Sequence, residues 1–470
     1  MANIADMQAL EMADALRRRE ISAVEAVEAA LGKIDDGQRL NAFISVCAER
    51  ALDEARASDE RLAAGAPVGP LHGLPFSVKD LTNTEGVRTT HGSILYKDAT
   101  PGEDAVAVAR ARAAGAILIG KTTTPEFGHK PFTDGPLFGR TLNPWDENVT
   151  CGGSSGGAAV AVAANMGPLA LGTDGGGSIR IPAACCGVVG MKATLGAIPN
   201  LQAPDLFGAN SYTGPMARNV GDTRMLFDAI KGPDRRDPYG QVAPSARHAS
   251  GQIRIAWLPR CGNILDPGIE RVVSAAIGHA ESLGLLVEQI EIDLASLEEP
   301  FLVILRSALL ARFGTETRRR PEIFDPTLLA TIEAGRRYSS ADLVAAQAAR
   351  TACFIRLQAL FETFDVIASP TLSAPPLAIG TDPLGQVEID GRNAGTIRGA
   401  WYPYTFPFNL TGHPAISIPC GLTDTGLPVG FQLVGRWHED DLLLDIAEAF
   451  EQAIGFSARP PRQRRERQSD

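Results

Sequence analysis

Two glycine-rich clusters that carry serine are the residues of this chain best suited to chemistry. Gly152-Gly153-Ser154-Ser155-Gly156-Gly157 forms the first cluster, and Gly175-Gly176-Gly177-Ser178 forms the second cluster. Glycine is favoured where the backbone takes a positive φ or approaches a ligand closely. Both clusters therefore place serine hydroxyls beside uncovered backbone N–H groups. A hydroxyl nucleophile with a stabilised oxyanion needs this combination.

The sequence around the clusters argues against a linker. A run such as GGSSGG is by itself typical of flexible linkers. Here residues 158–164 (AAVAVAA) predict a buried helix, and residues 168–172 (PLALG) predict a short buried strand. We therefore expect both clusters to be loops inside a core.

Lys79 is the third candidate catalytic residue. It follows residues 74–78 (LPFSV), which predict a buried strand. A lysine acts as a base only when it is neutral, and moving its pKa from about 10.4 to near 7 takes about 4 to 5 kcal/mol. Burial beside apolar residues supplies that penalty on the charge. An ion pair between Lys79 and Asp80 is the alternative interpretation.

Strand and helix patterns alternate around these residues, which predicts a sheet with helices on both faces. Residues 1–65 are predicted to be helical and packed on the core, with Ser22 and Glu25 forming a capping box. Residues 66–455 are assigned to an α/β core, interrupted at about 294–363 by a mainly helical surface insertion. Residues 456–470 are assigned to a basic, disordered tail.

Three other sequence features suggest alternative catalytic or binding sites. Residues 115–122 match a phosphate-binding loop, but the apolar strand lies between its glycines rather than before them. The first cluster also matches the nucleophile elbow of an α/β-hydrolase esterase, with His413 or His438 as the later base. A cysteine hydrolase built on Cys151 lacks a supporting motif.

Composition and net charge limit the classes of binding partner that we expect for this protein. The chain has 470 residues, a net charge of −11 and seven cysteines without a CxxC pair. The negative charge disfavours nucleic acid and anionic membranes as partners, and the histidine spacing predicts no metal site. With neither a signal peptide nor a membrane span in the pattern, and with cysteines typical of reduced thiols, we expect a cytoplasmic protein.

The order of several motifs makes the chain resemble the amidase signature family. The matching segments are 73–80 (GLPFSVKD), 143–146 (NPWD), the first cluster, 171–182 (LGTDGGGSIRIP), 187–190 (GVVG) and 426–433 (GLPVGFQL). The resemblance covers about residues 5–455. It implies an α/β fold: one large domain with a central mixed, twisted β-sheet flanked by helices on both faces.

The resemblance also implies roles for the candidate residues. Ser178 would be the nucleophile, Ser154 a proton relay held by a cis peptide, and Lys79 the base. The N–H groups of Gly175, Gly176, Gly177 and Ser178 are the expected oxyanion hole. Ser155 would orient Ser178 through a hydrogen bond. Asp174 and Arg180 would hold the loop, with a surface ion pair as the alternative for these two residues. No metal or other cofactor is expected.

The predicted activity is hydrolysis of the carbon–nitrogen bond of linear amides. We expect an acylamidase or aryl acylamidase acting on a small-molecule amide or carbamate (urethane), with esters as further substrates. The expected pocket residues are Phe127, Phe132, Phe138, Phe207 and Trp401. Alternatives are the glutamine-hydrolysing subunit of an amidotransferase, which would need a partner chain, and an inactive binding protein. A homodimer is compatible with all of these.

Overall fold

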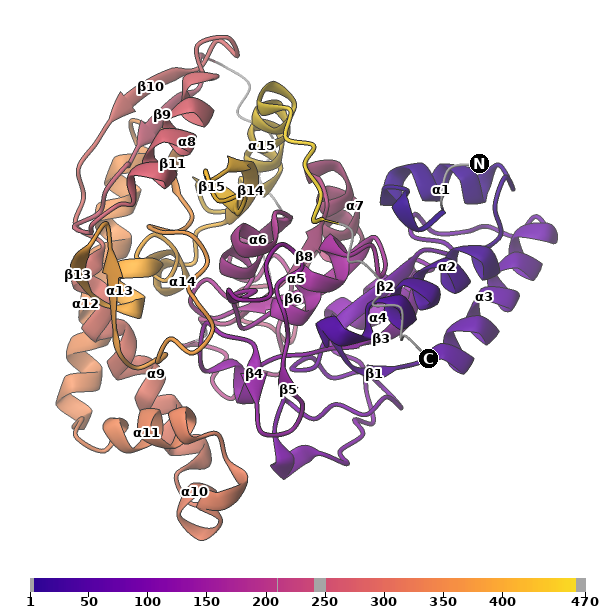
Figure 1. Ribbon diagram of the computed structural model, residues 1–470, viewed down its shortest axis with the longest axis horizontal. Coiled ribbons are helices and arrows are strands. Elements are labelled where there is room, and N and C mark those ends of the chain that lie inside the picture. The colour runs from indigo at the N-terminus through magenta and orange to yellow at the C-terminus, as the bar shows by residue number, and fades with distance from the viewer. Residues whose placement is uncertain (1–3, 209, 241–250, 462–470) are drawn as a thin grey trace, which may run out of the picture.

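A mixed sheet of 11 strands runs through the molecule and is flanked by helices (Figure 1). The computed structural model describes residues 4–208, 210–240 and 251–461. In spatial order the strands are β1 (Phe43–Val46), β3 (Ile117–Thr122), β2 (Pro75–Lys79), β6 (Leu169–Asp174), β8 (Tyr212–Ala217), β7 (Val189–Lys192), β14 (Ala415–Leu422), β15 (Pro428–Gly435), β11 (Val366–Pro370), β9 (Arg254–Trp257) and β10 (Leu286–Gln289). This confirms the predicted α/β class.

Helices fill most of the sequence between the strands. They are α1 (Ala9–Arg17), α2 (Ala23–Asp36), α3 (Ala48–Ala63), α4 (Val106–Ala113), α5 (Gly156–Ala163), α6 (Arg180–Cys186), α7 (Val220–Ile230), α8 (Pro267–Gly278), α9 (Glu298–Phe313), α10 (Glu316–Arg319), α11 (Pro326–Gly335), α12 (Ser340–Phe361), α13 (Ile397–Trp401), α14 (Pro407–Thr411) and α15 (Asp440–Ile454). Two small hairpins, β4 (Asp134–Gly135) with β5 (Gly139–Arg140) and β12 (Gln386–Ile389) with β13 (Arg392–Thr396), lie outside the main sheet.

The N-terminal segment is helical except for one strand that the sequence pattern did not predict. Ser22 caps α2 in the expected capping box, in which its side chain and Glu25 bond each other's backbone N–H. Residues 43–46, by contrast, form β1, which pairs antiparallel with β3 at one edge of the sheet. Four residues carry too little periodicity to separate a strand from a helix. β1 therefore corrects an all-helical assignment of residues 1–65.

Helices α9 to α12 occupy the segment where a helical insertion was predicted. In Figure 1 α9, α10 and α11 lie at the lower left and α12 runs along the left side. A small apolar cluster separate from the main core joins α9 to residues 324–332. Its buried members are Leu309, Phe313, Phe324, Leu328 and Ile332. Most of the predicted basic tail, residues 462–470, lies outside the described residues. Within the described ranges, no helix is long and apolar enough to cross a membrane.

Close strand packing near the clusters depends on glycine. Gly172 of β6 pairs with Gly214 of β8. A Cβ at Gly214 would lie 2.1 Å from the carbonyl oxygen of Met191 in β7, and one at Gly172 would lie 3.0 Å from the Ser155 hydroxyl. The close packing of β6 and β8 against their neighbours therefore requires glycine at positions 172 and 214.

Substitution of Gly214 tests this packing. Gly214→Ala should lower the free energy of unfolding by about 1–3 kcal/mol, because the new methyl group displaces backbone rather than a flexible side chain. Urea unfolding followed by circular dichroism measures the change. Gly278→Ala is the control, since a Cβ there meets nothing within 4 Å; equal losses in both variants would contradict the packing argument.

Candidate active site

Two parallel strands bring the candidate residues together at the carboxyl ends of the strands. β2 pairs parallel with β6, so Lys79 at the end of β2 lies near Thr173 and Asp174 at the end of β6. The first cluster leads directly into α5, which packs against both strands. The Ser155 N–H donates to the Ser178 carbonyl oxygen at 3.0 Å, which joins the two clusters.

The amino group of Lys79 is surrounded by uncharged oxygens. Its Nζ lies 2.8 Å from Ser154 Oγ, 2.9 Å from Ser155 Oγ and 2.9 Å from Thr173 Oγ1. The Thr173 carbonyl oxygen follows at 3.3 Å. Asp80 bonds instead to Thr90 and to the N–H of Gly92, which excludes the predicted alternative of a Lys79–Asp80 ion pair.

Burial sets the ionisation of this lysine. Lys79 is fully buried. This burial lowers its pKa well below the usual 10.5, and the Asp174 carboxylate offsets only part of the effect. Desolvation penalises the ammonium form when no carboxylate bonds to it. The arrangement therefore favours a neutral amine that can accept a proton from a serine hydroxyl.

Asp174 is turned away from Lys79 by a buried ion pair. Arg180 Nε donates to Asp174 Oδ2 at 3.0 Å, and neither side chain is accessible to solvent. Asn409 Nδ2 and the N–H of Ile179 also donate to the carboxylate. Burial alone would raise the pKa of Asp174, but Arg180 and these hydrogen bonds hold it well below its usual range. The pair is therefore part of the core, which excludes the surface alternative.

The backbone of the second cluster has both engaged and available N–H groups. The Gly177 N–H donates to Asp174 Oδ1 at 2.6 Å. Within the described residues, no acceptor lies in hydrogen-bond reach of the N–H groups of Gly175, Gly176 or Ser178. Gly177 has φ +117, and a Cβ there would lie 2.4 Å from Thr405 Oγ1. The Gly177 N–H thus holds the loop, and three of the four predicted oxyanion donors are free for a ligand.

The serines of the two clusters differ in solvent exposure. Ser154 and Ser155 are buried, whereas Ser178 is partly exposed. The peptide bond between Gly153 and Ser154 is cis. Only Ser178 therefore combines access for a substrate with free N–H groups next to it.

The histidines of the competing esterase motif lie elsewhere. The His413 ring stacks on Phe361 at 5.1 Å and bonds to Thr411. Burial lowers the pKa of His413 to about 3. His438 bonds through its backbone N–H to Thr194. Within the described chain, neither histidine contacts the serines of the first cluster, so the geometry does not support a nucleophile elbow.

The structure also argues against the phosphate-binding loop and against a cysteine hydrolase built on Cys151. Lys121 is buried within β3, where its Nζ donates to Thr84 and Thr89 hydroxyls at 2.8 and 3.0 Å. Burial raises the pKa of Cys151 to about 12, so its thiolate is inaccessible near neutral pH. Among the described residues there is no group of three or more metal-ligating side chains.

An arc of aromatic rings connects the two clusters. The backbone of Phe132 lies against Gly153, and the Phe132 ring stacks on Trp401 with 6.0 Å between the ring centres. Trp401 contacts Tyr402, and the guanidinium of Arg398 lies over the Tyr402 ring. Arg398 also lies 4.5 Å from the centre of the Phe301 ring. Phe301 closes the arc, because its ring edge lies 2.9 Å from a Cβ placed on Gly176.

The other predicted pocket residues lie apart from this arc. Phe127 stacks on Phe313 of α9 at 3.9 Å, next to Gly128, which approaches Ser154. Phe138 lies on the β4–β5 hairpin, where its carbonyl oxygen accepts from Asn41. Phe207 is 75% exposed. The structure brings Phe132 and Trp401 together and leaves Phe138 and Phe207 without a contact to either cluster.

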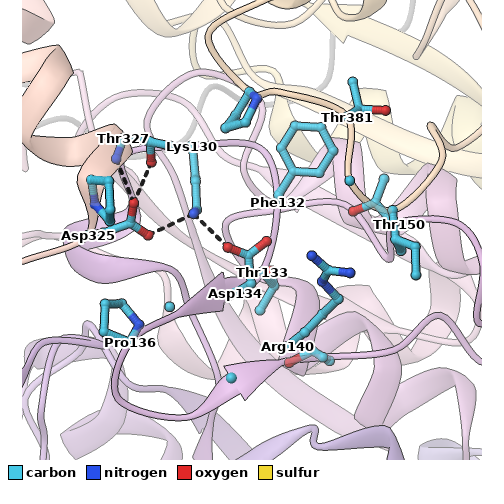
Figure 2. Close-up of a pocket in the computed structure, with 17 residues that line it drawn as sticks. Lys130, Phe132, Thr133, Asp134, Pro136, Arg140, Thr150, Asp325, Thr327 and Thr381 are labelled. Atoms are coloured by element: carbon cyan, nitrogen blue, oxygen red, sulfur yellow. Dashed lines mark hydrogen bonds and ion pairs between the residues drawn. The ribbon is translucent and has the colours of Figure 1, made fainter.

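A cavity of about 520 Å³ lies beside the first cluster. Figure 2 shows Lys130 between Asp134 and Asp325, at 2.6 and 2.7 Å, with Phe132 on another wall. Thr133 connects the cavity to the first cluster, since its hydroxyl donates to the Gly152 carbonyl at 2.8 Å. A second cavity of about 630 Å³ lies between α4 and residues 199–202. In the described ranges neither cavity is lined by Lys79 or Ser178.

Three residues at the site were not predicted. Thr173 contacts Lys79 and stands directly before Asp174, inside one of the motifs that carry the family resemblance. Its position at the end of a strand beside Lys79 was a usable signal. Phe301 and Arg398 come from distant segments, and only tertiary packing places them here. Tyr402 directly follows the predicted pocket residue Trp401.

Comparison with known proteins agrees with this geometry. A family model described as Amidase matches residues 25–444. An acylamidase from Rhodococcus erythropolis is 34% identical over 98% of both chains. The A subunit of the glutamyl-tRNA(Gln) amidotransferase from Moorella thermoacetica is 35% identical over 97% of this chain and 98% of its own. The crystal structure of a bacterial aryl acylamidase of the amidase signature family aligns with a TM-score of 0.88 at 28% identity, covering 95% of this chain and 96% of that one.

The buried ion pair gives a prediction for stability. Arg180→Leu should lower the free energy of unfolding by about 3–5 kcal/mol, because it leaves the Asp174 charge buried without its partner. Thermal or urea unfolding measures this loss. Arg271→Leu, which breaks an exposed pair with Asp424, is the control and should leave stability unchanged. A loss no larger than that of the control would contradict the role given to Arg180.

Proposed function

The chain belongs to the amidase family, and on that premise we propose that it is an acylamidase working through an acyl-enzyme on Ser178. It is an amide-hydrolysing enzyme. The observation that carries the proposal is the enclosure of Lys79, whose Nζ lies 2.8 Å from the Ser154 hydroxyl without a carboxylate bonded to it. Burial lowers the pKa of such a lysine, and this favours the neutral form that can act as a base.

The first half of the reaction forms the acyl-enzyme. Lys79 accepts the proton of Ser154, and Ser154 accepts that of Ser178 as its oxygen attacks the amide carbonyl. The tetrahedral oxyanion lies against the free N–H groups of Gly175, Gly176 and Ser178. Loss of one such donor typically costs about 3–4 kcal/mol of transition-state stabilisation.

The second half returns the proton. Collapse of the tetrahedral intermediate breaks the carbon–nitrogen bond, and Ser154 passes a proton to the departing amine. Water then attacks the acyl-enzyme and loses a proton through Ser154 to Lys79. Collapse of this second tetrahedral intermediate breaks the ester bond to Ser178, the proton returns from Lys79 through Ser154 to the Ser178 oxygen, and the carboxylic acid leaves. Each proton taken up by Lys79 is returned within the cycle, so protons and bonds balance.

The aromatic arc supports apolar amides and anilides as substrates. Phe301, Tyr402, Trp401 and Phe132 are almost completely buried between the two clusters, and none of them is more than 6% exposed. They make this wall of the site apolar, and an apolar wall favours apolar or aromatic groups. Carbamates (urethanes) and esters carry the same planar carbonyl, so the same residues can act on them.

A glutaminase subunit is the second candidate, because amidotransferase A subunits are similar to this chain along almost its whole length. Glutamine brings an ammonium and a carboxylate that both need charged partners. Arg398 of the arc has N–H groups that can bind the carboxylate, but none of the described residues of the arc carries an acidic side chain that can bind the ammonium. The arc therefore favours the acylamidase.

A substrate panel separates the candidates. Purified protein is assayed on an anilide, a primary amide, a carbamate, an ester and glutamine. We expect the anilide or an apolar amide to give the highest kcat/KM, and Ser178→Ala to abolish turnover. The exposed Ser274→Ala variant serves as a control with full activity. Glutamine as the preferred substrate would contradict the acylamidase, and robust turnover by Ser178→Ala would contradict the nucleophile.

The pH profile tests the base. A base must be unprotonated to act, so kcat/KM should fall as pH decreases through the pKa of Lys79, which burial places well below 10.5. Lys79→Met should lose several orders of magnitude in kcat/KM, while the exposed Lys97→Met variant keeps the wild-type profile. Full activity of Lys79→Met at any pH would refute the assignment.

A further inference from the structure

The outward side of α12 is apolar and exposed. This 22-residue helix packs its inner side, including the buried Cys353 and Leu357, against α9 and α14. On the opposite side Val344 is 64% exposed and Ile355 is 62% exposed. The residues of this outer face, all in the exposed class, are Ala341, Val344, Ala345, Ala348, Ala352, Ile355 and Ala359.

Helical spacing makes these seven residues one continuous surface. They recur every three or four positions, so they lie above one another along the helix. None of them is charged or polar. Exposed apolar patches of this kind mark interaction sites more often than free surface.

We propose that the outer face of α12 is the contact surface for a second copy of this chain, with the two α12 helices antiparallel about a two-fold axis. This proposal is independent of the proposed function. A two-fold contact requires a surface that is complementary to itself, and three features of the outer face meet that requirement.

The first feature is the order of large and small residues. Val344 and Ile355 lie near the two ends, and alanines lie between them. An antiparallel pair centred between residues 349 and 350 sets Val344 opposite the partner's Ile355. Ala348 and Ala352 flank the centre, where their small side chains let the helices approach closely.

The second feature is charge. Asp342 and Arg356 are both exposed and lie about four helical turns apart, so both flank the outer face on one side. They are equidistant, to within one residue, from the same centre. The two-fold axis therefore brings Asp342 close to the partner's Arg356, and it does so twice, with opposite charges each time.

The third feature is size. The outer face extends about 27 Å from Ala341 to Ala359, at about 1.5 Å per residue. A standard interface of about 800 Å² per partner is about 30 Å across. α12 therefore spans the centre of such an interface, and its neighbours complete the rim.

Sedimentation equilibrium of the full chain tests the proposal. The wild type should be a dimer at micromolar concentration, and Ala348→Arg should raise the dissociation constant at least about 100-fold by placing two like charges across the axis. Gln347→Arg puts the same charge on the adjacent exposed residue, off the outer face, and should remain dimeric. Equal circular dichroism spectra and amide-hydrolysis rates would exclude misfolding as the cause. A monomeric wild type, or equal dissociation in both variants, would overturn the proposal.

Disulfide trapping tests the antiparallel register. In a Cys47→Ser background, which removes the one cysteine that is not buried, Ala348→Cys should cross-link under mild oxidation because its two copies lie next to the axis. Val344→Cys should not, since its copies lie about 16 Å apart along the helices. Equal cross-linking at both positions would indicate parallel helices and contradict the register.

Discussion

A lysine amino group enclosed among hydroxyls, with its nearest carboxylate bound elsewhere, is the constraint on which this site depends. Burial lowers the pKa of Lys79 well below its usual range, and an ion pair with Asp174 would oppose that shift. Arg180 instead holds Asp174 in an ion pair that is itself fully buried. The same carboxylate fixes the second cluster through the Gly177 N–H. One buried pair thus engages the carboxylate that would otherwise be available to Lys79 and also fixes the backbone of the second cluster.

The central sheet fixes the relative positions of the candidate catalytic residues. β2 and β6 are parallel neighbours, so their ends bring Lys79 and Thr173 to one edge without a long loop. α5 starts at the first cluster and packs on both strands, which places Ser154 and Ser155 over that edge. The helical segment then contributes Phe301 from α9, which closes the aromatic arc next to Gly176. The candidate catalytic residues therefore lie at strand ends of the sheet and beside α5, whereas Phe301 of the aromatic arc comes from the helical segment.

Local sequence predicted the parts of this molecule that local physics determines. The apolar run after the first cluster predicts α5, and the strand before Lys79 predicts β2, because both are continuous buried segments. The sequence could not predict β1, which is four residues long and is recognised only by its pairing with β3. The sequence analysis also did not predict Arg398 and Phe301 as site residues, because contacts between distant segments leave no periodic signal in the sequence. Phe207 was predicted as a pocket residue from its aromatic side chain within residues 201–212, and its side chain is 75% exposed, which neither its type nor its segment indicates.

Labelling with a fluorophosphonate probe, followed by mass spectrometry of the modified peptide, tests the central claim most directly. The probe reacts with a serine hydroxyl only when a base and an oxyanion site activate it. We expect modification of Ser178 in the wild type and its loss in Lys79→Met. Modification of Ser154 or Ser155 instead, or undiminished labelling of Lys79→Met, would contradict the assignment of Ser178 as a nucleophile activated by Lys79.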